Sequence, residues 1–299
     1  MTNMLEKDIF IAVCSSFLMS VSIVVTKMGL GHFPPLLFAA LRFLVIIPFL
    51  PFFPLPKASW KHILIISLCW GMFYLGGIHC ALACGVGAGM VTILTQMSTF
   101  IGFLLSWFIL QDRPTVEKLL GTAIGICGII LICSQGDMHE NFLGIIFLVF
   151  SSISFAMGSI FVKKMKTPPV ALNIWVNGLC FLPMFLIASL STESIVQPIL
   201  TATLNDWCLI IGAGISSVVL GGVCWVYVLG KYPISTIMPF RLLIPVFGVL
   251  LSTFILSEVH ETTTWIGTCL VFLGLVITQT TICNFITKKS FYTKKQFAL

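Results

Sequence analysis

Arg241 stands inside an apolar stretch, 233–257, of this 299-residue chain. It lies about eight residues from the start of that stretch, which is about 12 Å along a helix. A buried charge is costly unless it is paired or hydrated, so such an arginine normally faces a cavity. Its guanidinium can hold a carboxylate or phosphate with two hydrogen bonds. We therefore expect Arg241 to bind an anionic group, and the alternative is that it caps carbonyls of a neighbouring helix or snorkels.

A stripe of polar residues runs along the apolar segment 87–111. Thr92, Thr95, Gln96 and Thr99 follow the spacing i, i+3, i+4, i+7, which places them on one face of a helix. This face could line a polar cavity. It could also make ordinary hydrogen bonds between helices, each of about 0.6 kcal/mol.

Hydroxyl and aromatic residues in four other apolar segments are further candidates for a binding site. Ser22 and Ser159 could contact a polar ligand, although small hydroxyl residues also allow helices to pack closely. Tyr74 and Trp225 could form aromatic walls, or they could pack between helices. Arg42 also lies deep in an apolar segment, and we expect it to be structural. We expect His79 to be a hydrogen-bonded helix residue with no part in a site.

Two prolines flank Arg241 in the sequence. Pro239 and Pro245 each lack a backbone N–H, so they leave carbonyls of the preceding turn without a partner. Such carbonyls are free to receive donors from elsewhere.

The composition excludes a soluble protein. Hydrophobic residues make up 58% of the chain, charged residues 9%, and the mean hydropathy is +1.10. About a quarter of the residues in an ordinary globular domain are charged. Disorder is excluded as well, because apolar residues dominate throughout. The chain is therefore expected to cross a membrane several times, with about 20 apolar residues in each span.

Apolar runs separated by charge, glycine or proline predict an all-α polytopic membrane protein with ten transmembrane helices. The predicted helices are 8–29, 34–54, 60–82, 87–111, 116–134, 142–165, 169–190, 206–229, 233–257 and 263–285. If the N-terminus is cytoplasmic, 13 of the 16 Lys and Arg residues lie on the inner side. This bias predicts that both termini are cytoplasmic.

The second half of the chain repeats the first. Segments 102–131 and 248–277 align without gaps and are identical at ten positions, including Gly102/Gly248 and Gly121/Gly267. The same offset pairs Thr95 with Arg241. We predict a first repeat at 1–136, a second at 137–287 and a basic cytoplasmic tail at 288–299. Five helices in each half give the halves opposite orientation, a signature of secondary transporters, unless the duplication serves stability alone.

Several segments together resemble the EamA family of the drug/metabolite transporter superfamily. They are Lys27 to Leu30, Pro34-Pro35, Leu41-Arg42-Phe43, Gly158 to Lys164, Leu229 to Tyr232, and Pro239 to Gly248. The chain is most similar to the branch that contains the O-acetylserine/cysteine exporters. The resemblance implies ten helices in two inverted halves, with a central cavity lined by helices 1, 3, 4, 6, 8 and 9.

Two departures from the family pattern concern the implied cavity. Phe155 takes the place of a tryptophan that the family often has in helix 6, and Arg241 takes the place of a small residue in helix 9. Members of the family move amino acids, their derivatives, nucleosides or drugs. The two departures imply a cavity that differs from theirs.

We therefore expect a secondary transporter in the bacterial inner membrane that moves a small polar metabolite, an amino acid or a derivative of one, by alternating access. The expected binding residues are Arg241, Thr92, Thr95, Gln96, Ser22, Tyr74, Phe155, Ser159 and Trp225. The alternatives are a receptor or scaffold, or a carrier of a nucleoside-like metabolite or drug. An enzyme is not expected, because no base, nucleophile or metal cluster is evident.

The remaining expectations concern partners and coupling. We expect no cofactor, metal or nucleic acid, and either a monomer or a homodimer. All ten carboxylates lie in termini, loops or helix ends. Since proton-driven carriers usually place an ionisable group along the path, the sequence favours facilitated movement or exchange.

Overall fold

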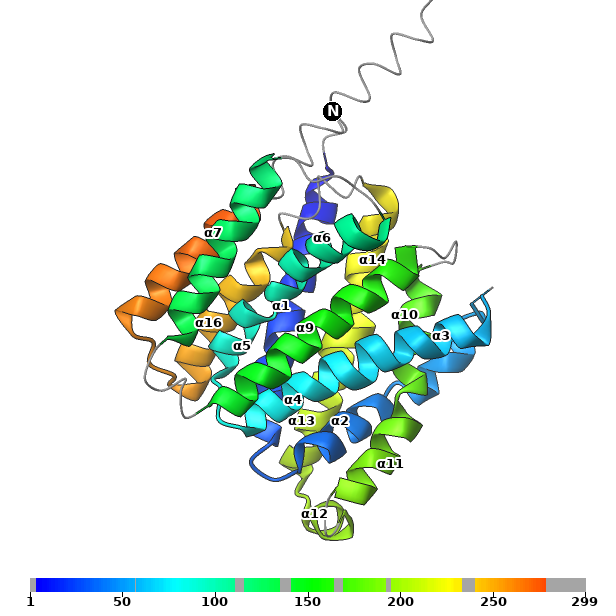
Figure 1. Ribbon diagram of the computed structural model, residues 1–299. Helices are drawn as coiled ribbons and strands as arrows, with labels where there is room; N and C mark the ends of the chain where they lie inside the picture. The colour runs from blue at the N-terminus through cyan, green and yellow to red at the C-terminus, as the bar shows by residue number, and fades with distance from the viewer. Residues whose placement is uncertain are drawn as a thin grey trace, which may run out of the picture.

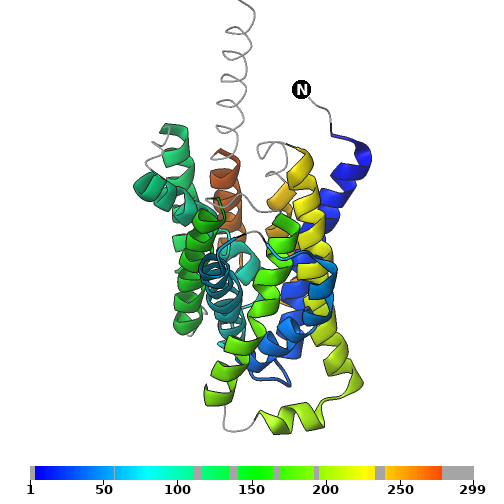
Figure 2. The same ribbon diagram turned by 90° about the vertical axis from the view of Figure 1, so that its right-hand side faces the viewer.

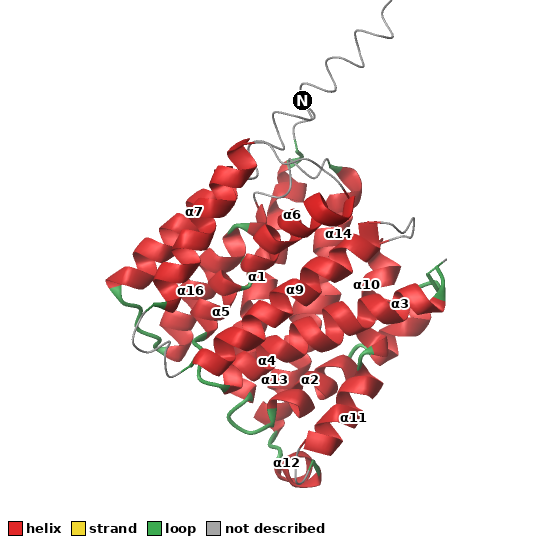
Figure 3. Ribbon diagram, viewed as in Figure 1, coloured by secondary structure: helices red, strands yellow, loops and turns green. Residues whose placement is uncertain are grey.

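The structure is a computed structural model that describes residues 4–56, 58–110, 116–134, 141–163, 169–191, 195–232 and 240–277. Throughout these residues the chain forms helices and loops, without a strand (Figure 3). Several predicted segments lie outside the described residues. They are the start of the predicted helix 233–257, including Pro239, the end of the predicted helix 263–285, and the basic tail at 288–299.

Six helices are long and apolar enough to cross a membrane, and four shorter ones are also apolar. The long ones are Glu6–Gly29, Pro35–Phe52, Trp60–Ala83, Phe142–Val162, Val170–Ser191 and Leu204–Trp225; the shorter ones are Ala88–Gly102, Leu119–Cys133, Leu243–Leu256 and Thr262–Ile277. These helices fall on the segments that hydropathy predicts. The chain is thus an all-helical, multi-pass membrane protein.

Most of the long helices consist of shorter elements joined end to end (Figure 1). In chain order the elements are α1 (Glu6–Gly29), α2 (Pro35–Leu44), η1 (Ile47–Phe52), α3 (Trp60–Ile66), η2 (Ser67–Leu75), α4 (Gly76–Ala83), α5 (Ala88–Leu94), α6 (Met97–Leu110), α7 (Val116–Cys133), α9 (Phe142–Lys163), α10 (Pro169–Leu179), α11 (Phe181–Ser191), α12 (Val196–Thr201), α13 (Leu204–Gly214), η3 (Ile215–Gly222), α14 (Val223–Lys231) and α16 (Leu243–Leu256).

The interruptions recur at matching places of the two sequence repeats. The predicted helix 87–111 breaks at Thr95 and Gln96, and the break at Leu242, before α16, lies at the equivalent position under the offset that pairs Gly102 with Gly248. The predicted helices 60–82 and 206–229 each contain a π-helical segment, η2 and η3. Single π-turns in α-helices are frequent at functional sites.

Prolines explain the breaks in a further pair of predicted helices, 34–54 and 169–190. Pro48 and Pro51 lie in η1, so the predicted helix 34–54 is α-helical only as far as Leu44. Helix 169–190 breaks at Cys180, three residues before Pro183, between α10 and α11.

The centre of the bundle is formed around α1, which packs against α5, α13, η3, α14 and α16. The largest apolar core joins Leu82 and Val91 to Val249 and Val271, so residues far apart in the sequence share it. The start of α1 and α12 lie at opposite ends of the molecule in both views (Figures 1 and 2). α12 was not expected from hydropathy, because it is a short element in a loop.

α7 packs closely against helix Thr262–Ile277 at one edge of the bundle. A Cβ added at Gly128 would lie 2.6 Å from the carbonyl oxygen of Gly267, and one added at Gly274 would lie 2.5 Å from that of Gly121. Only residues without a side chain allow the two backbones to approach this far. Gly121 and Gly125, four residues apart in the sequence, therefore take part in packing within the chain, since the same Cβ at Gly274 would also lie 2.6 Å from the Gly125 nitrogen.

Candidate functional site

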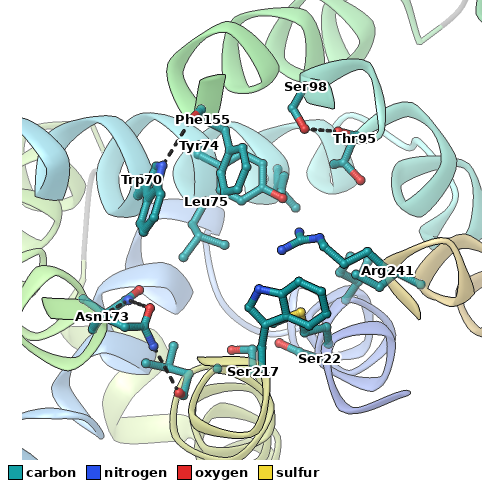
Figure 4. A pocket seen from close by; sticks show the side chains of 18 of the residues that line it. Ser22, Trp70, Tyr74, Leu75, Thr95, Ser98, Phe155, Asn173, Ser217 and Arg241 are labelled. Atoms are coloured by element: carbon teal, nitrogen blue, oxygen red, sulfur yellow. Dashed lines mark hydrogen bonds between the residues drawn. The ribbon is translucent and has the colours of Figure 1, made fainter. Parts of the chain in front are cut away.

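A central cavity of about 270 Å³ lies where the interrupted helices meet (Figure 4). Its size is near the lower end of the usual range for ligand pockets, about 300–1,000 Å³. Its lining comes from α1, α2, η2, α4, the turn between α5 and α6, α6, α9, α10, η3, α14 and residues 241–244. The predicted residues that line it are Ser22, Tyr74, Thr95, Gln96, Phe155, Trp225 and Arg241. Their roles stay predictions.

Arg241 reaches into this cavity from the break before α16. Figure 4 shows its side chain pointing inward, and its guanidinium carbon lies 5.2 Å from the centroid of the Trp225 ring. Such a cation–π contact is worth about 0.5–2 kcal/mol. It holds the guanidinium against one wall of the cavity, where the group still faces the cavity interior.

Pro245 explains how Arg241 is held at the level of the backbone. Proline has no N–H to donate to the carbonyl four residues earlier, which here is that of Arg241. The Gln96 side chain supplies the missing donor: its Nε2 lies 3.4 Å from the Arg241 carbonyl oxygen. The two equivalent helix breaks are thus joined by a direct hydrogen bond.

The break between α5 and α6 has its own local cause. The backbone N–H of Gln96 donates to Ile93 over 3.0 Å, and the N–H of Ser98 donates to Thr95 over 3.1 Å, so the chain tightens to i→i+3 bonds here. The hydroxyls of Thr92, Thr95 and Ser98 each donate to the carbonyl three residues earlier. Local bonds of this kind compete with the helix and bend it. They leave the hydroxyl oxygens of Thr95 and Ser98 as acceptors toward the cavity.

Thr92 and Ser159 are not among the residues that line the cavity. Thr92 is fully buried and packs against α16, where a Cβ added at Gly248 would lie 2.2 Å from its Oγ1. The Ser159 hydroxyl donates to the carbonyl of Phe155 over 2.8 Å. Both hydroxyls therefore serve their own helices.

Three aromatic rings form one wall of the cavity. Trp70 stacks on Phe155, with centroids 5.4 Å apart and planes 16° apart, and Tyr74 lies 4.6 Å from the same Phe155 ring. The indole N–H of Trp70 donates to the Phe155 carbonyl over 3.1 Å, which fixes the stack (Figure 4). The π-helical segment η2 supplies two of the three rings.

Serines of α1 fasten the interrupted helices around the cavity. The hydroxyl of Ser16 donates to Phe240 over 2.7 Å, and that of Ser20 donates to Ile244 over 2.8 Å, on either side of Arg241. Ser22, which lines the cavity, donates to the Ala213 carbonyl over 3.1 Å. These serines hold α1 against the neighbouring helices by donating hydrogen bonds to backbone carbonyls.

Arg42 was expected to be structural, because helix 2 was not expected to line the cavity. The structure corrects the expectation about helix 2: Arg42 of α2 lines the cavity and is only 4% exposed. Its Nη2 donates to the hydroxyl of Ser217 in η3. Its Nε is buried without a hydrogen-bond partner among the described residues. The sequence signal was present, since a deep arginine normally faces a cavity.

Asn173 and Asn177 are two further lining residues that the sequence analysis missed. They lie on α10, so helix 7 joins helix 2 in lining the cavity. Asn177 Nδ2 donates to the Asn173 carbonyl over 2.8 Å, and Asn173 Nδ2 lies 3.4 Å from the Val218 carbonyl oxygen. Their spacing of i, i+4 on an apolar helix was the available signal.

His79 lies outside the cavity lining, as expected of a hydrogen-bonded helix residue. It is fully buried, its Nδ1 lies 2.6 Å from the Leu75 carbonyl oxygen, and its ring packs on Phe38. Among the described residues, no three His, Cys, Asp or Glu side chains are grouped to hold a metal ion.

Two charged side chains, Glu258 and Lys27, form hydrogen bonds to backbone groups near the start of α5. The carboxylate of Glu258 accepts hydrogen bonds from the backbone N–H groups of Ala88, over 2.6 Å, and Gly89, over 3.1 Å. A carboxylate at this position complements the positive end of the helix dipole. Lys27 donates to the carbonyl of Leu82, at the end of α4, over 2.8 Å.

Long apolar helices, paired interruptions and a cavity at their junction define a multi-pass membrane protein with a central cavity lined by polar and apolar side chains. The model of the EamA-like transporter family matches this chain twice, over residues 7–134 and 142–280. The chain belongs to the EamA-like transporter family.

Two curated relatives match almost the whole chain. A probable amino-acid metabolite efflux pump of Salmonella typhimurium is 30% identical over 285 residues, which cover 92% of this chain and 95% of the relative. The protein with the same description in Escherichia coli is 27% identical with the same coverage. An uncharacterized inner membrane transporter of Escherichia coli, YedA, is 28% identical over 48% of this chain and 49% of its own length.

One solved crystal structure is similar in fold. It superposes with a TM-score of 0.58 at 17% sequence identity, and the superposition covers 92% of this chain and 96% of the other. At this identity the likeness concerns the fold alone.

Proposed function

We propose that this protein is a secondary transporter that carries a small polar metabolite, an amino acid or amino-acid derivative, through the central cavity by alternating access. It works in the inner membrane, and Arg241 holds the substrate carboxylate while Thr95 and Gln96 contact the substrate from the opposite helix break. The observation that carries the proposal is the meeting of two equivalent helix breaks at one cavity that holds two arginines and several hydroxyl and amide side chains. Interrupted helices at corresponding positions of two repeats are the usual binding site in carriers.

The proposed architecture has ten spans in two inverted halves, 1–136 and 137–287, with both termini in the cytoplasm. Six long and four shorter apolar helices support the number of spans. The two matches to the family model support the division into halves. The excess of Lys and Arg on one side supports the orientation.

Substrate size favours a metabolite over a drug. A cavity of about 270 Å³ suits a molecule with few heavy atoms. The relatives named as probable amino-acid metabolite efflux pumps support the same class of substrate. No Asp or Glu is found among the described residues that line the cavity, which supports facilitated movement or exchange over a proton relay through buried carboxylates.

The test is counterflow in proteoliposomes that contain only the purified chain. Vesicles are loaded with an unlabelled amino acid or derivative, diluted, and supplied with a trace of the labelled compound. Transient accumulation of label, absent from vesicles without protein, is the expected result. Binding of a compound without any counterflow would instead support a receptor, and chemical conversion without counterflow would support an enzyme.

A further inference from the structure

Two guanidinium groups enter the same cavity, and the described residues give neither of them an anion. Arg42 comes from α2 and Arg241 from the break before α16, and both are lining residues. Neither forms an ion pair with a described Asp or Glu. Arg42 is 4% exposed, and its Nε has no hydrogen-bond partner among the described residues.

The rest of the described lining leaves this positive charge uncompensated. Apart from the two arginines, it consists of apolar, aromatic, hydroxyl and amide side chains, with no Asp, Glu, Lys or His. Charges interact strongly where water is scarce, so two cations around a small chamber create a strongly positive potential. One carboxylate would neutralise only half of this charge.

The two arginines approach the chamber at separate points. Arg42 bonds to the Ser217 hydroxyl and Arg241 lies over the Trp225 ring. Those two contacts are eight residues apart along η3 and α14, which is about two helical turns. The arrangement suits acid groups at the two ends of a ligand better than two acids on one carbon.

We propose that the cavity binds a small metabolite with two acid groups and a net negative charge, one acid at Arg241 and the other at Arg42. This rests on the proposed function as a carrier, and it narrows the substrate class within it. The side-chain oxygens of Thr95 and Ser98 already donate their protons to backbone carbonyls. They remain as acceptors, so an amino group on the substrate is tolerated.

The experiment compares each diacid with its own monoamide, which has nearly the same shape and one acid fewer. Labelled aspartate and asparagine, glutamate and glutamine, and adipate and adipamic acid are tested by counterflow in proteoliposomes of the wild-type chain. For at least one pair we expect counterflow of the diacid to exceed that of the monoamide by tenfold or more.

Variants of Arg42 assign the second acid group. Arg42→Gln removes the charge and keeps a donor for Ser217, so it should lower the diacid preference at least tenfold while counterflow of the monoamide persists. Arg42→Lys keeps the charge and should retain most of the preference. Ser159→Ala is the control, because the Ser159 hydroxyl bonds to the Phe155 carbonyl of its own helix and lies outside the cavity lining; it should retain the preference.

The outcomes separate this inference from the proposed function. Counterflow of neutral amino acids equal to that of the diacids would overturn the inference and leave the carrier intact. An unchanged preference in Arg42→Gln would also overturn it. Equilibrium binding of the labelled diacids to the purified wild-type chain gives a second readout. If no compound shows either binding or counterflow, both the inference and the proposed function are contradicted.

Discussion

The guanidinium of Arg241 rests over the indole ring of Trp225, with its central carbon 5.2 Å from the ring centroid. Trp225 lies in α14, and Arg241 lies at the break before α16. The ring fixes where the cation stands, and Figure 4 shows the side chain directed toward the centre of the cavity. The geometry of the proposed carboxylate site therefore depends on Trp225 as well as on Arg241.

Replacing Trp225 should weaken substrate binding. Trp225→Leu removes a cation–π contact worth about 0.5–2 kcal/mol, which corresponds to an increase of about 2- to 30-fold in KM. KM for counterflow is the quantity to measure. Trp265→Leu is the control, because Trp265 is an exposed residue that does not line the cavity. An equal KM in the two variants would show that the ring does not position the arginine.

Gln96 and Thr92 share a predicted face, and they should respond differently to substitution. Gln96→Leu leaves the Arg241 carbonyl, already without a helical donor because of Pro245, with no side-chain partner. An unpaired buried carbonyl costs about 1–3 kcal/mol, so we expect KM for counterflow to rise several-fold.

Thr92→Val is the matched comparison within the same helix. It keeps the shape that packs against Gly248 and loses one local bond to the Gly89 carbonyl. The lost hydrogen bond, with a net contribution of about 1 kcal/mol, stabilises helix packing and not substrate binding. KM should therefore stay within about twofold of the wild-type value. A larger change in KM for Thr92→Val than for Gln96→Leu would place the site on the other side of α5.

Glu258 should protect the first turn of α5. Glu258→Gln keeps the size of the side chain and removes the charge that accepts hydrogen bonds from Ala88 and Gly89. Charge-assisted bonds at a helix N-terminus contribute about 1–2 kcal/mol. Hydrogen–deuterium exchange of these two amides should become about 5- to 30-fold faster. Glu261→Gln, a change in the same loop, should leave their exchange unchanged, and equal rates in wild type and Glu258→Gln would contradict the assignment.

Packing of α7 against the last described helix should depend on Gly128. Gly128→Ala places a Cβ 2.6 Å from the Gly267 carbonyl, so the helices must separate and the thermal unfolding temperature should fall. Gly212→Ala is the control, because the nearest atom to its Cβ is a Val25 methyl 3.9 Å away. Alanine has the higher helix propensity by about 1 kcal/mol, so Gly212→Ala should be neutral or stabilising. A more stable Gly128→Ala would refute the close packing.

Hydropathy predicts the apolar segments because the need for about 20 apolar residues per span is a local property. The position of Arg241 is predictable for the same reason, since the penalty for a charge depends on its depth. The neighbours of a deep arginine are a property of the whole fold. Arg42 and Arg241 look alike in sequence, and the expectation that helix 2 does not line the cavity came from the family resemblance. In the fold Arg42 contacts Ser217 and lines the cavity.

The predicted polar face failed in part because it assumed an ideal helix. Thr92, Thr95 and Gln96 share one face only if every residue turns by the same angle. The i→i+3 bonds at Gln96 change that angle, so Thr95 and Gln96 line the cavity while Thr92 packs against α16. The π-helical segments were equally unpredictable, because their carbonyls receive hydrogen bonds from residues distant in sequence, as Gly221 of η3 does from the Ser15 hydroxyl.

The most direct test of transport through this cavity is counterflow by the purified wild-type chain beside Arg241→Leu and Arg241→Lys, in proteoliposomes with matched protein content. The labelled panel consists of carboxylate-bearing amino acids and their derivatives. We predict counterflow of at least one of these compounds by the wild type, loss of at least tenfold in Arg241→Leu, and partial recovery in Arg241→Lys, which keeps the charge without the planar fork. Equal counterflow by all three proteins would contradict a substrate site at Arg241.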